Sequence, residues 1–165
     1  MADTARGLVS ITPVVTIAAD SDADAVDAIH HDIKQSLGGK LEYTKADGND
    51  RWFYSTSVDV TASHADLISG NFTDTGTVSN SDYVRFLFVK NSGTTDGSTS
   101  TNSKVYITLD GGDPAANSDS VELDVDEAII LKFKSSGSHV TVNNLHAATS
   151  SGTVRCTVAA IIDDA

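Results

Sequence analysis

Hydrophobic and polar residues alternate in short runs along most of the chain, and the pattern is strongest from residue 83 onward. Successive side chains of a strand point to opposite faces, so an alternation with a period of two predicts β-strands. Gly, Asn, Asp or Ser separates one run from the next. The runs are YVRFLFVK, KVYITLD, SVELDV, AIILKFK, HVTVNNL and TVRCTVAAII. Together with strands expected nearer the N-terminus, they predict a mainly β chain folded as an antiparallel β-sandwich, jelly-roll-like in its number of strands.

One segment follows a helical period instead. Its apolar residues recur at steps of three and four, which places them on one side of a helix. They are Val26, Ile29, Ile33 and Leu37. Aspartates near the start complement the positive end of a helix dipole, and two glycines follow the last apolar residue. We therefore expect one amphipathic helix, over residues 21–37, in the N-terminal half of the chain.

Residues 1–19 contain LVSITPVVTI, a run of β-branched residues that Pro13 interrupts. Proline lacks a backbone donor and is confined to edge strands, so we expect an edge strand or an arm here. One β-sandwich domain is expected to follow, over residues 20–165. An arm of this kind can add to the sheet of a neighbouring subunit. Burial in the core of the chain itself explains its apolar residues equally well. The candidate interface residues of the arm are Val9, Ile11, Val14 and Val15.

A hairpin is predicted where residues 40–45 (KLEYTK) and 51–61 (RWFYSTSVDVT) flank the turn-forming sequence ADGND. Alternation along its second strand places five residues on one face and sends Phe53 to the other. The five are Trp52, Tyr54, Thr56, Val58 and Val60. Large aromatic side chains are enriched at protein interfaces, so Trp52 and Tyr54 are candidate interface residues, with a place in the core as the alternative.

The stretch NSGTTDGSTSTNS, residues 91–103, separates two of the strongest predicted strands and contains only small or polar residues. Such a composition cannot bury a core of its own. A sandwich accommodates a long connection at its rim, because the entropic cost of a loop grows only logarithmically with its length. Two interpretations follow: a flexible surface loop, or a loop that becomes ordered against a partner.

The net charge of the chain is −12 over 165 residues, which narrows the possible partners. A polyanion is repelled by the phosphate backbone of nucleic acids and by anionic membrane surfaces, so we expect neither as a partner. No stretch approaches the roughly 20 apolar residues that span a bilayer, and the N-terminus lacks the features of a secretory signal. Cys156 is the one cysteine, which excludes an internal disulfide, and its alternation with Val154 and Val158 predicts a place in the core.

Candidate catalytic and metal-binding residues are few. Asp110 and Asp113 lie in LDGGDPAANSDS and are weak candidates for a calcium site, although Asp-Gly and Asp-Pro pairs are also ordinary turn chemistry. The five histidines show no metal-ligand spacing, and no GxSxG, phosphate-loop or dinucleotide motif occurs. We therefore expect no cofactor, no bound metal and no enzymatic activity.

Four segments of the C-terminal half resemble small virion structural proteins of tailed bacteriophages. They are FLFVKNSG (86–93), VYITLDGG (105–112), DEAIILKF (126–133) and SGTVRCTVAAIIDD (151–164). In those proteins a strand ending in a Lys-Asn-(Ser/Thr)-Gly step precedes a strand ending in Asp-Gly-Gly. A segment that begins acidic and becomes apolar follows, and a last strand closes the domain. The resemblance covers about residues 83–164 and consists of strand and turn residues, without a catalytic signature.

This resemblance implies a non-enzymatic virion protein, in particular a capsid decoration or cement protein that is made in the host cytoplasm and binds the outer surface of the capsid. It also implies the major capsid protein or other virion proteins as partners, and association as a homotrimer. Two alternatives stay open. One is a tail, collar or fibre component, and the other is a carbohydrate-binding β-sandwich module.

Overall fold

The chain divides into two compact units, Met1–Gly48 and Asn49–Ala165. In this computed structural model the described residues are 14–16, 42–44, 51–68, 79–115, 118–134 and 140–163. Two strands of the first unit, β1 (Val14–Thr16) and β2 (Glu42–Thr44), pair in parallel. The helix expected over residues 21–37 lies outside the described residues, as do Val9 and Ile11. The domain boundary expected after residue 19 stays a prediction.

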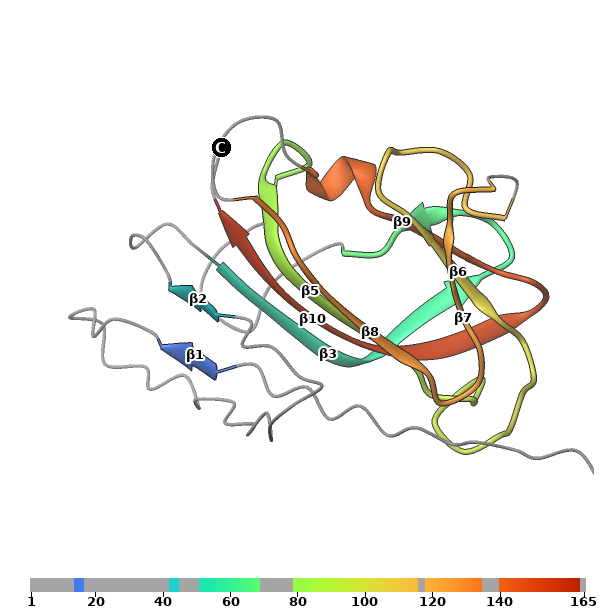
Figure 1. Ribbon diagram of the computed structural model, residues 1–165. Helices are drawn as coiled ribbons and strands as arrows, with labels where there is room; N and C mark the ends of the chain where they lie inside the picture. Colours follow the sequence, from blue (N-terminus) through green and yellow to red (C-terminus); the bar gives the residue numbers. More distant parts are fainter. Residues whose placement is uncertain are drawn as a thin grey trace, which may run out of the picture. The chain divides into compact units, whose positions relative to one another are not determined.

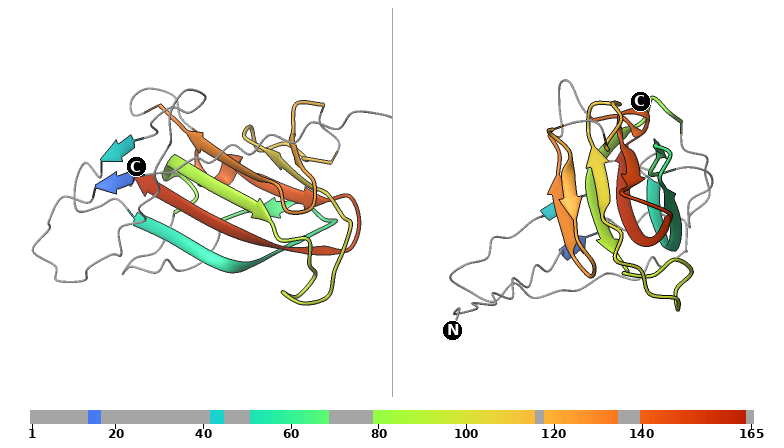
Figure 2. Two further views of the ribbon diagram at one scale, coloured as in Figure 1. Left: turned by 60° about the horizontal axis from the view of Figure 1, so that its bottom comes forward. Right: turned by 90° about the vertical axis from the view of Figure 1, so that its right-hand side faces the viewer.

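The second unit contains two four-stranded antiparallel sheets (Figure 1, Figure 2). The long sheet has the strand order β3 (Arg51–Thr61), β10 (Thr153–Asp163), β5 (Tyr83–Asn91) and β8 (Ala128–Lys132). The short sheet has the order β4 (Ala65–Asp66), β9 (His146–Thr149), β6 (Val105–Thr108) and β7 (Val121–Leu123). The prediction of a mainly β chain is confirmed, and the two sheets fit a sandwich-like arrangement.

The described part of the chain contains little helix. One short 3-10 helix, η1 (Val142–Asn144), precedes β9. No helix among the described residues is long and apolar enough to cross a membrane.

Both sheets contribute to one hydrophobic core. The short sheet supplies Val105 and Ile107 from alternate positions of β6. The long sheet supplies five alternate residues of its inner strand β10, all of them fully buried, as the alternation in the sequence predicts. They are Val154, Cys156, Val158, Ala160 and Ile162. Full burial of an aliphatic side chain is worth about 1.5–3 kcal/mol, so β10 is a main source of the stability of the second unit.

The predicted hairpin between residues 40–45 and 51–61 is not formed by the described strands. β2 pairs with β1, and β3 pairs with β10, which joins it to a strand about a hundred positions away in the chain. Instead β3 becomes the first strand of the long sheet, with β10 on one side only among the described strands.

A β-bulge in β3 changes the faces that alternation predicts. Three steps along β3, from Ser55 to Val58, match only two steps along β10. One extra residue in a strand reverses which side chains reach the core beyond it. The side chain of Tyr54 is accordingly 51% exposed, whereas Val60 is buried in the core. The prediction that Tyr54 and Val60 share a face is wrong for this reason.

Candidate binding surface

The connection from β5 to β6 is fixed by hydrogen bonds within the chain; we call residues 91–103 the rim loop. Asn91, the last residue of β5, is fully buried at its base. The side-chain Nδ2 of Asn91 donates to the carbonyl oxygens of Ser103 (3.1 Å) and Leu123 (3.2 Å), and its Oδ1 accepts the amide of Gly93 (2.8 Å). One side chain thus ties the two ends of the loop to each other and to β7.

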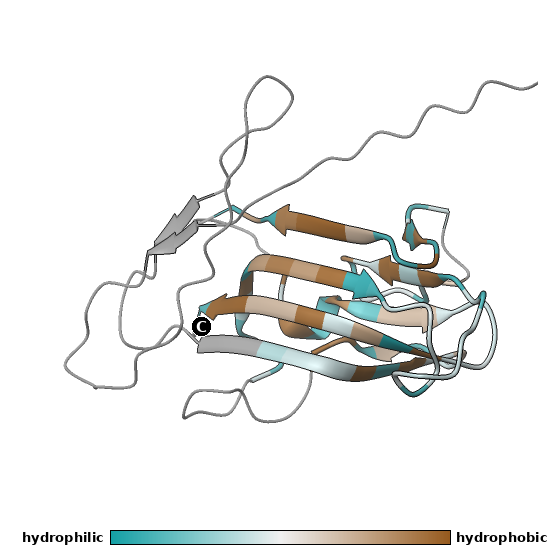
Figure 3. Ribbon diagram, turned by 90° about the horizontal axis from the view of Figure 1, so that it is seen from below, coloured by the Kyte–Doolittle hydropathy of each residue, from teal (hydrophilic) through white to brown (hydrophobic). Residues whose placement is uncertain are grey.

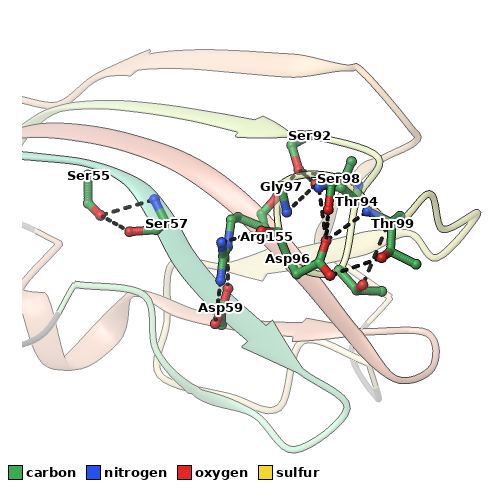
Figure 4. A network of polar contacts seen from close by, with 11 residues as sticks. Ser55, Ser57, Asp59, Ser92, Thr94, Asp96, Gly97, Ser98, Thr99 and Arg155 are labelled. Atoms are coloured by element: carbon green, nitrogen blue, oxygen red, sulfur yellow. Dashed lines mark hydrogen bonds and ion pairs between the residues drawn. The ribbon is translucent and has the colours of Figure 1, made fainter.

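Asp96 organises the tip of the rim loop (Figure 4). Its Oδ1 accepts the backbone amides of Thr99 (2.7 Å) and Ser98 (2.8 Å), and its Oδ2 accepts the hydroxyl of Thr99 (2.9 Å). These bonds, the amide of Thr99 first, favour the charged carboxylate and hold the pKa of Asp96 well below its ordinary value. The tip therefore has a defined shape that it owes to its own residues.

Arg155 connects the rim loop to the long sheet (Figure 4). From β10, its Nε and Nη2 donate to the two carboxylate oxygens of Asp59 on β3, at 2.8 and 3.2 Å, and its Nη1 donates to the backbone carbonyl of Asp96. The backbone of Arg155 also donates to the carbonyl of Thr94 (2.8 Å) and accepts the amide of Ser92 (3.1 Å). The hydrogen bond from Arg155 lowers the pKa of Asp59. Strands β3 and β10 thereby hold the loop at one end of the long sheet.

The structure shows a rim loop with many hydrogen bonds to the chain itself, and a contact between this loop and a partner stays a prediction. The chain itself supplies the partners of the rim loop, so it needs no second molecule to become ordered. The sequence Asp96-Gly97-Ser98-Thr99 could have indicated the turn at the tip of the loop, because an aspartate followed by small residues often accepts nearby backbone amides with its carboxylate. The contribution of Arg155 carries no such local signal, since it comes from the last strand.

Hydrophobic residues are frequent along the ribbons of the long sheet (Figure 3), and several of them alternate with the core residues and therefore lie on the outer face, turned away from the core. The strand register aligns one residue from each of the four strands: Tyr54 opposite Ala159, Ala159 opposite Phe88, and Phe88 opposite Ile130. We call these four residues the apolar row. Tyr54 is exposed and Phe88 and Ile130 are half-buried, so part of this row is accessible from outside.

The neighbouring row on the same face is more deeply buried. It contains Ile161, which is 1% exposed, and Phe86, which is 4% exposed, and it ends on β8 at the exposed Lys132. Trp52, a candidate from the sequence, lies opposite Ile161 in β3. The outer face of the long sheet is thus apolar across its inner strands, which distinguishes it from the polar outer face that a solvent-facing sheet ordinarily shows.

The two calcium candidates act as turn residues. Asp110 Oδ1 accepts the amide of Gly112 (2.9 Å), and Asp113 Oδ1 accepts the amide of Ala115 (3.1 Å). Among the residues that the structure describes, no group of three or more His, Cys, Asp or Glu side chains is arranged to hold a metal ion. The geometry therefore accounts for both aspartates through the backbone of their own turn.

Two histidines that are far apart in the sequence meet beside the short sheet. The rings of His64 and His146 stack with their centroids 5.3 Å apart. His146 Nε2 lies 3.1 Å from a carboxylate oxygen of Asp66, and His64 Nδ1 lies 3.7 Å from one of Asp113. This cluster links β4, β9 and the turn after β6, and no sequence spacing indicates it.

The remaining candidates are placed as follows. Val14 and Val15 belong to β1 of the first unit, opposite Glu42 and Tyr43 of β2. Burial raises the pKa of the Cys156 thiol to about 12, so it stays protonated near neutral pH and is not a nucleophile there. Tyr54 is the predicted interface residue whose burial the structure describes, and its side chain is 51% exposed.

No protein-family model, no curated protein and no solved structure matches this chain. The rim loop and the apolar row are consequently interpreted from their own chemistry. Arg155 of β10 holds the rim loop beside β3, and the apolar row contains one residue of each of these two strands. We treat the rim loop and the apolar row together as the candidate surface.

Proposed function

We propose that this chain is a non-enzymatic virion structural protein that decorates or cements the outer shell of a tailed-bacteriophage capsid through protein–protein contacts. The resembling segments within residues 83–164 supply β5, β6, β8 and β10. Their turn residues also have structural roles, since Asn91 and Gly93 of the Lys-Asn-Ser-Gly step form the base of the rim loop. The resemblance therefore involves residues that shape a surface.

The observation that carries the proposal is the order of the eight strands that the structure describes in the second unit. Counted from β3, the long sheet contains the first, eighth, third and sixth strands, and the short sheet contains the second, seventh, fourth and fifth. This order supports a jelly-roll-like fold, in which two Greek keys wrap two sheets. Jelly rolls occur in viral capsid domains and in lectins, so the fold alone is compatible with both functions. The choice between them depends on the residues of the candidate surface.

The candidate surface suits a protein partner of fixed shape. Exposed tyrosine is enriched at protein interfaces because its ring buries apolar area while its hydroxyl remains able to bond. A rim loop that is already ordered loses little conformational entropy when a partner binds it. Contacts of modest strength suffice on a shell, because many identical copies bind an array of identical sites.

Co-sedimentation of the purified full chain with empty heads and with tails of the virus that encodes it tests the proposal. Capsid decoration predicts saturable binding to heads. Binding to tails alone would replace it with the tail-component alternative, and binding to neither particle would refute a virion role.

Two variants locate the contact on the chain. Tyr54→Ala removes the exposed ring of the apolar row and is expected to weaken binding to heads about tenfold or more, the usual effect of an aromatic interface residue. Tyr106→Ala is the matched control, because Tyr106 is a half-buried tyrosine of β6 in the short sheet, outside the candidate surface. Deletion of residues 2–12, which leaves β1 intact, tests the first part of the arm separately: unchanged occupancy of heads would remove Val9 and Ile11 from the proposal.

A carbohydrate-binding module is the second candidate, and the exposed ring of Tyr54 is the observation that favours it. Sugar rings stack on accessible aromatic faces. Titration of the full chain against a panel of glycans, followed by intrinsic fluorescence, gives a saturable change under this alternative. A flat response that is the same for the chain and for Tyr54→Ala would eliminate it.

A further inference from the structure

We propose that His64 and His146 form a proton-sensitive clasp: their charged rings hold the turn after β6 against the short sheet, and their neutral rings let it open. We call residues 110–115 the clasp turn. This inference goes beyond the virion role and does not depend on it. It rests on the two acceptors that face His146, and on the contacts of both histidines with neighbouring residues of one turn.

His146 lies between two hydrogen-bond acceptors. Its Nε2 is 3.1 Å from a carboxylate oxygen of Asp66, which lies directly opposite it on β4, and its Nδ1 is 3.2 Å from the carbonyl oxygen of Gly112. Carboxylate and carbonyl oxygens both accept, so both contacts are hydrogen bonds only when each ring nitrogen carries a proton. The surroundings of His146 therefore suit the charged form of its ring.

A neutral ring keeps only one of these two contacts. We expect its single proton on Nε2, because a hydrogen bond to a carboxylate is stronger than one to a carbonyl. Nδ1 then directs a lone pair at the oxygen of Gly112, and the His146 side chain is only 15% exposed, so water reaches that nitrogen poorly. Loss of the proton thus weakens the contact with the clasp turn and keeps the contact with β4.

His64 contacts the same turn from the connection between β3 and β4. Its ring stacks on that of His146, with the centroids 5.3 Å apart, and its Nδ1 lies 3.7 Å from a carboxylate oxygen of Asp113, the residue after Gly112. This contact is an ion pair only when His64 is protonated. The side chains of His64 and Asp113 are 45% and 48% exposed, so their pair adds less than the contact of His146. Both histidines nevertheless lose their hold on the clasp turn together.

The charge of the cluster is balanced in its protonated form. Among the described residues, the charged groups around the two rings are Asp66 and Asp113, one beside each ring, and Asp110, which accepts the amide of Gly112 at 2.9 Å. The adjoining elements also contribute neutral residues: Thr108 from β6, Val60 from β3 and Asn144 from η1. Histidine is the side chain whose charge ordinarily changes between about pH 5 and 8, so a response in that range is assigned to the two rings.

Other attachments of the clasp turn are few among the described residues. The amide of Gly111 donates to the carbonyl of Asn144 (2.9 Å), and the hydroxyl of Thr108 donates to the carbonyl of Gly112 (3.0 Å). The carboxylate of Asp113 accepts an amide within the turn itself, and so does that of Asp110. The Gly111 amide therefore reports whether the turn is attached to the rest of the unit.

Amide hydrogen exchange of the full chain tests the clasp at Gly111, at about pH 5.5 and about pH 8, on either side of the ordinary histidine range. After correction for the intrinsic dependence on pH, we expect this amide to be protected about fivefold more at the lower pH, the effect of one hydrogen bond. His146→Gln stays uncharged and has one donor group, so its Gly111 amide should exchange at the faster rate at both pH values. The Thr99 amide is the internal control, because its acceptor Asp96 has a pKa well below this range.

Nitrogen-15 spectra of the His146 ring in the unaltered chain give a second readout that needs no variant. We expect protons on both nitrogens at the lower pH and on Nε2 alone at the higher pH. A proton that stays on Nδ1 at the higher pH would keep the Gly112 contact and overturn the inference. Equal protection of Gly111 at both pH values, or a pH response that persists in His146→Gln, would overturn it as well. None of these outcomes bears on whether the chain binds capsids, which the head co-sedimentation decides separately.

Discussion

Replacement of Asn91 by alanine tests the conclusion that one buried amide fixes the rim loop. The Asn91 side chain makes three hydrogen bonds at 2.8–3.2 Å, to Gly93, Ser103 and Leu123, in a site with no exposed surface. A hydrogen bond of this kind contributes about 1 kcal/mol to stability, so the three together contribute about 3 kcal/mol. That is a large share of the roughly 5–15 kcal/mol that stabilises an ordinary domain.

Urea unfolding and thermal unfolding at neutral pH measure the loss of stability of Asn91→Ala relative to the unaltered chain. We expect the free energy of unfolding to fall by about 3 kcal/mol and the melting temperature to fall by roughly 10 °C. Asn102→Ala is the matched control, because Asn102 lies in the same loop but is exposed, and it is expected to change stability by less than about 0.5 kcal/mol.

Asn91→Asp keeps the oxygen acceptor of this side chain and replaces its amide donor with a second carboxylate oxygen. The substituted carboxylate still accepts the amide of Gly93, but it faces the carbonyls of Ser103 and Leu123 without a proton to donate. We expect a loss at neutral pH as large as that of Asn91→Ala, which becomes smaller in acid as the carboxyl gains a proton. A loss below about 1 kcal/mol for both variants would refute the argument that Asn91 holds the loop.

Three further predictions follow from the same structure. Gly93 has a φ of 67°, and a Cβ there would lie 2.6 Å from Val125 Cγ1, so Gly93→Ala is expected to cost about 1–2 kcal/mol in urea unfolding. Adding Val125→Ala should recover the steric part of that cost, and no recovery would contradict the proposed clash. The lowered pKa of Asp96 means that its contribution is complete above the ordinary aspartate range and is lost as the pH falls through the lowered value. Amide exchange at Thr99, corrected for its intrinsic dependence on pH, should therefore become faster only below the ordinary aspartate range, whereas Asp96→Ala, which removes both acceptor oxygens, should show fast exchange at neutral pH as well. The Cys156 thiol, with its pKa raised to about 12 in the core, should react with a thiol reagent at neutral pH only after unfolding; equal rates in the folded and unfolded chain would contradict its burial.

Local pattern was sufficient for the central strand of the fold. The alternation of TVRCTVAAII predicted that Cys156 and its neighbours at steps of two face the core, and all of them are buried. The same reasoning failed in β3, because a bulge is not visible in a hydrophobic pattern: the residues on both sides of it still alternate. It also failed for the partner of β3, since two strands separated by a turn sequence do not have to pair when a more apolar strand is available elsewhere in the chain.

The candidate surface was predictable only in part. Tyr54 was a candidate from the sequence because aromatic side chains are enriched at protein interfaces, and its side chain is exposed. The rest of the apolar row could not be identified, since its members come from four strands whose order is a property of the sheet. Ala159 and Phe88 in particular sit in β10 and β5, where inward-facing neighbours mask an outward apolar residue in the pattern.

The sequence by itself determined the class of this protein and the interior of its strands: a mainly β chain, an acidic composition, a buried cysteine and a loop of small polar residues. These follow from side-chain alternation and composition, which act over a few neighbouring residues. Tertiary structure alone decided that β3 lies beside β10 and that Arg155 and Asn91 fix the rim loop. Each of these depends on contacts between distant segments, and a contact of that kind is selected by the free energy of the whole packed unit rather than by any one stretch of chain.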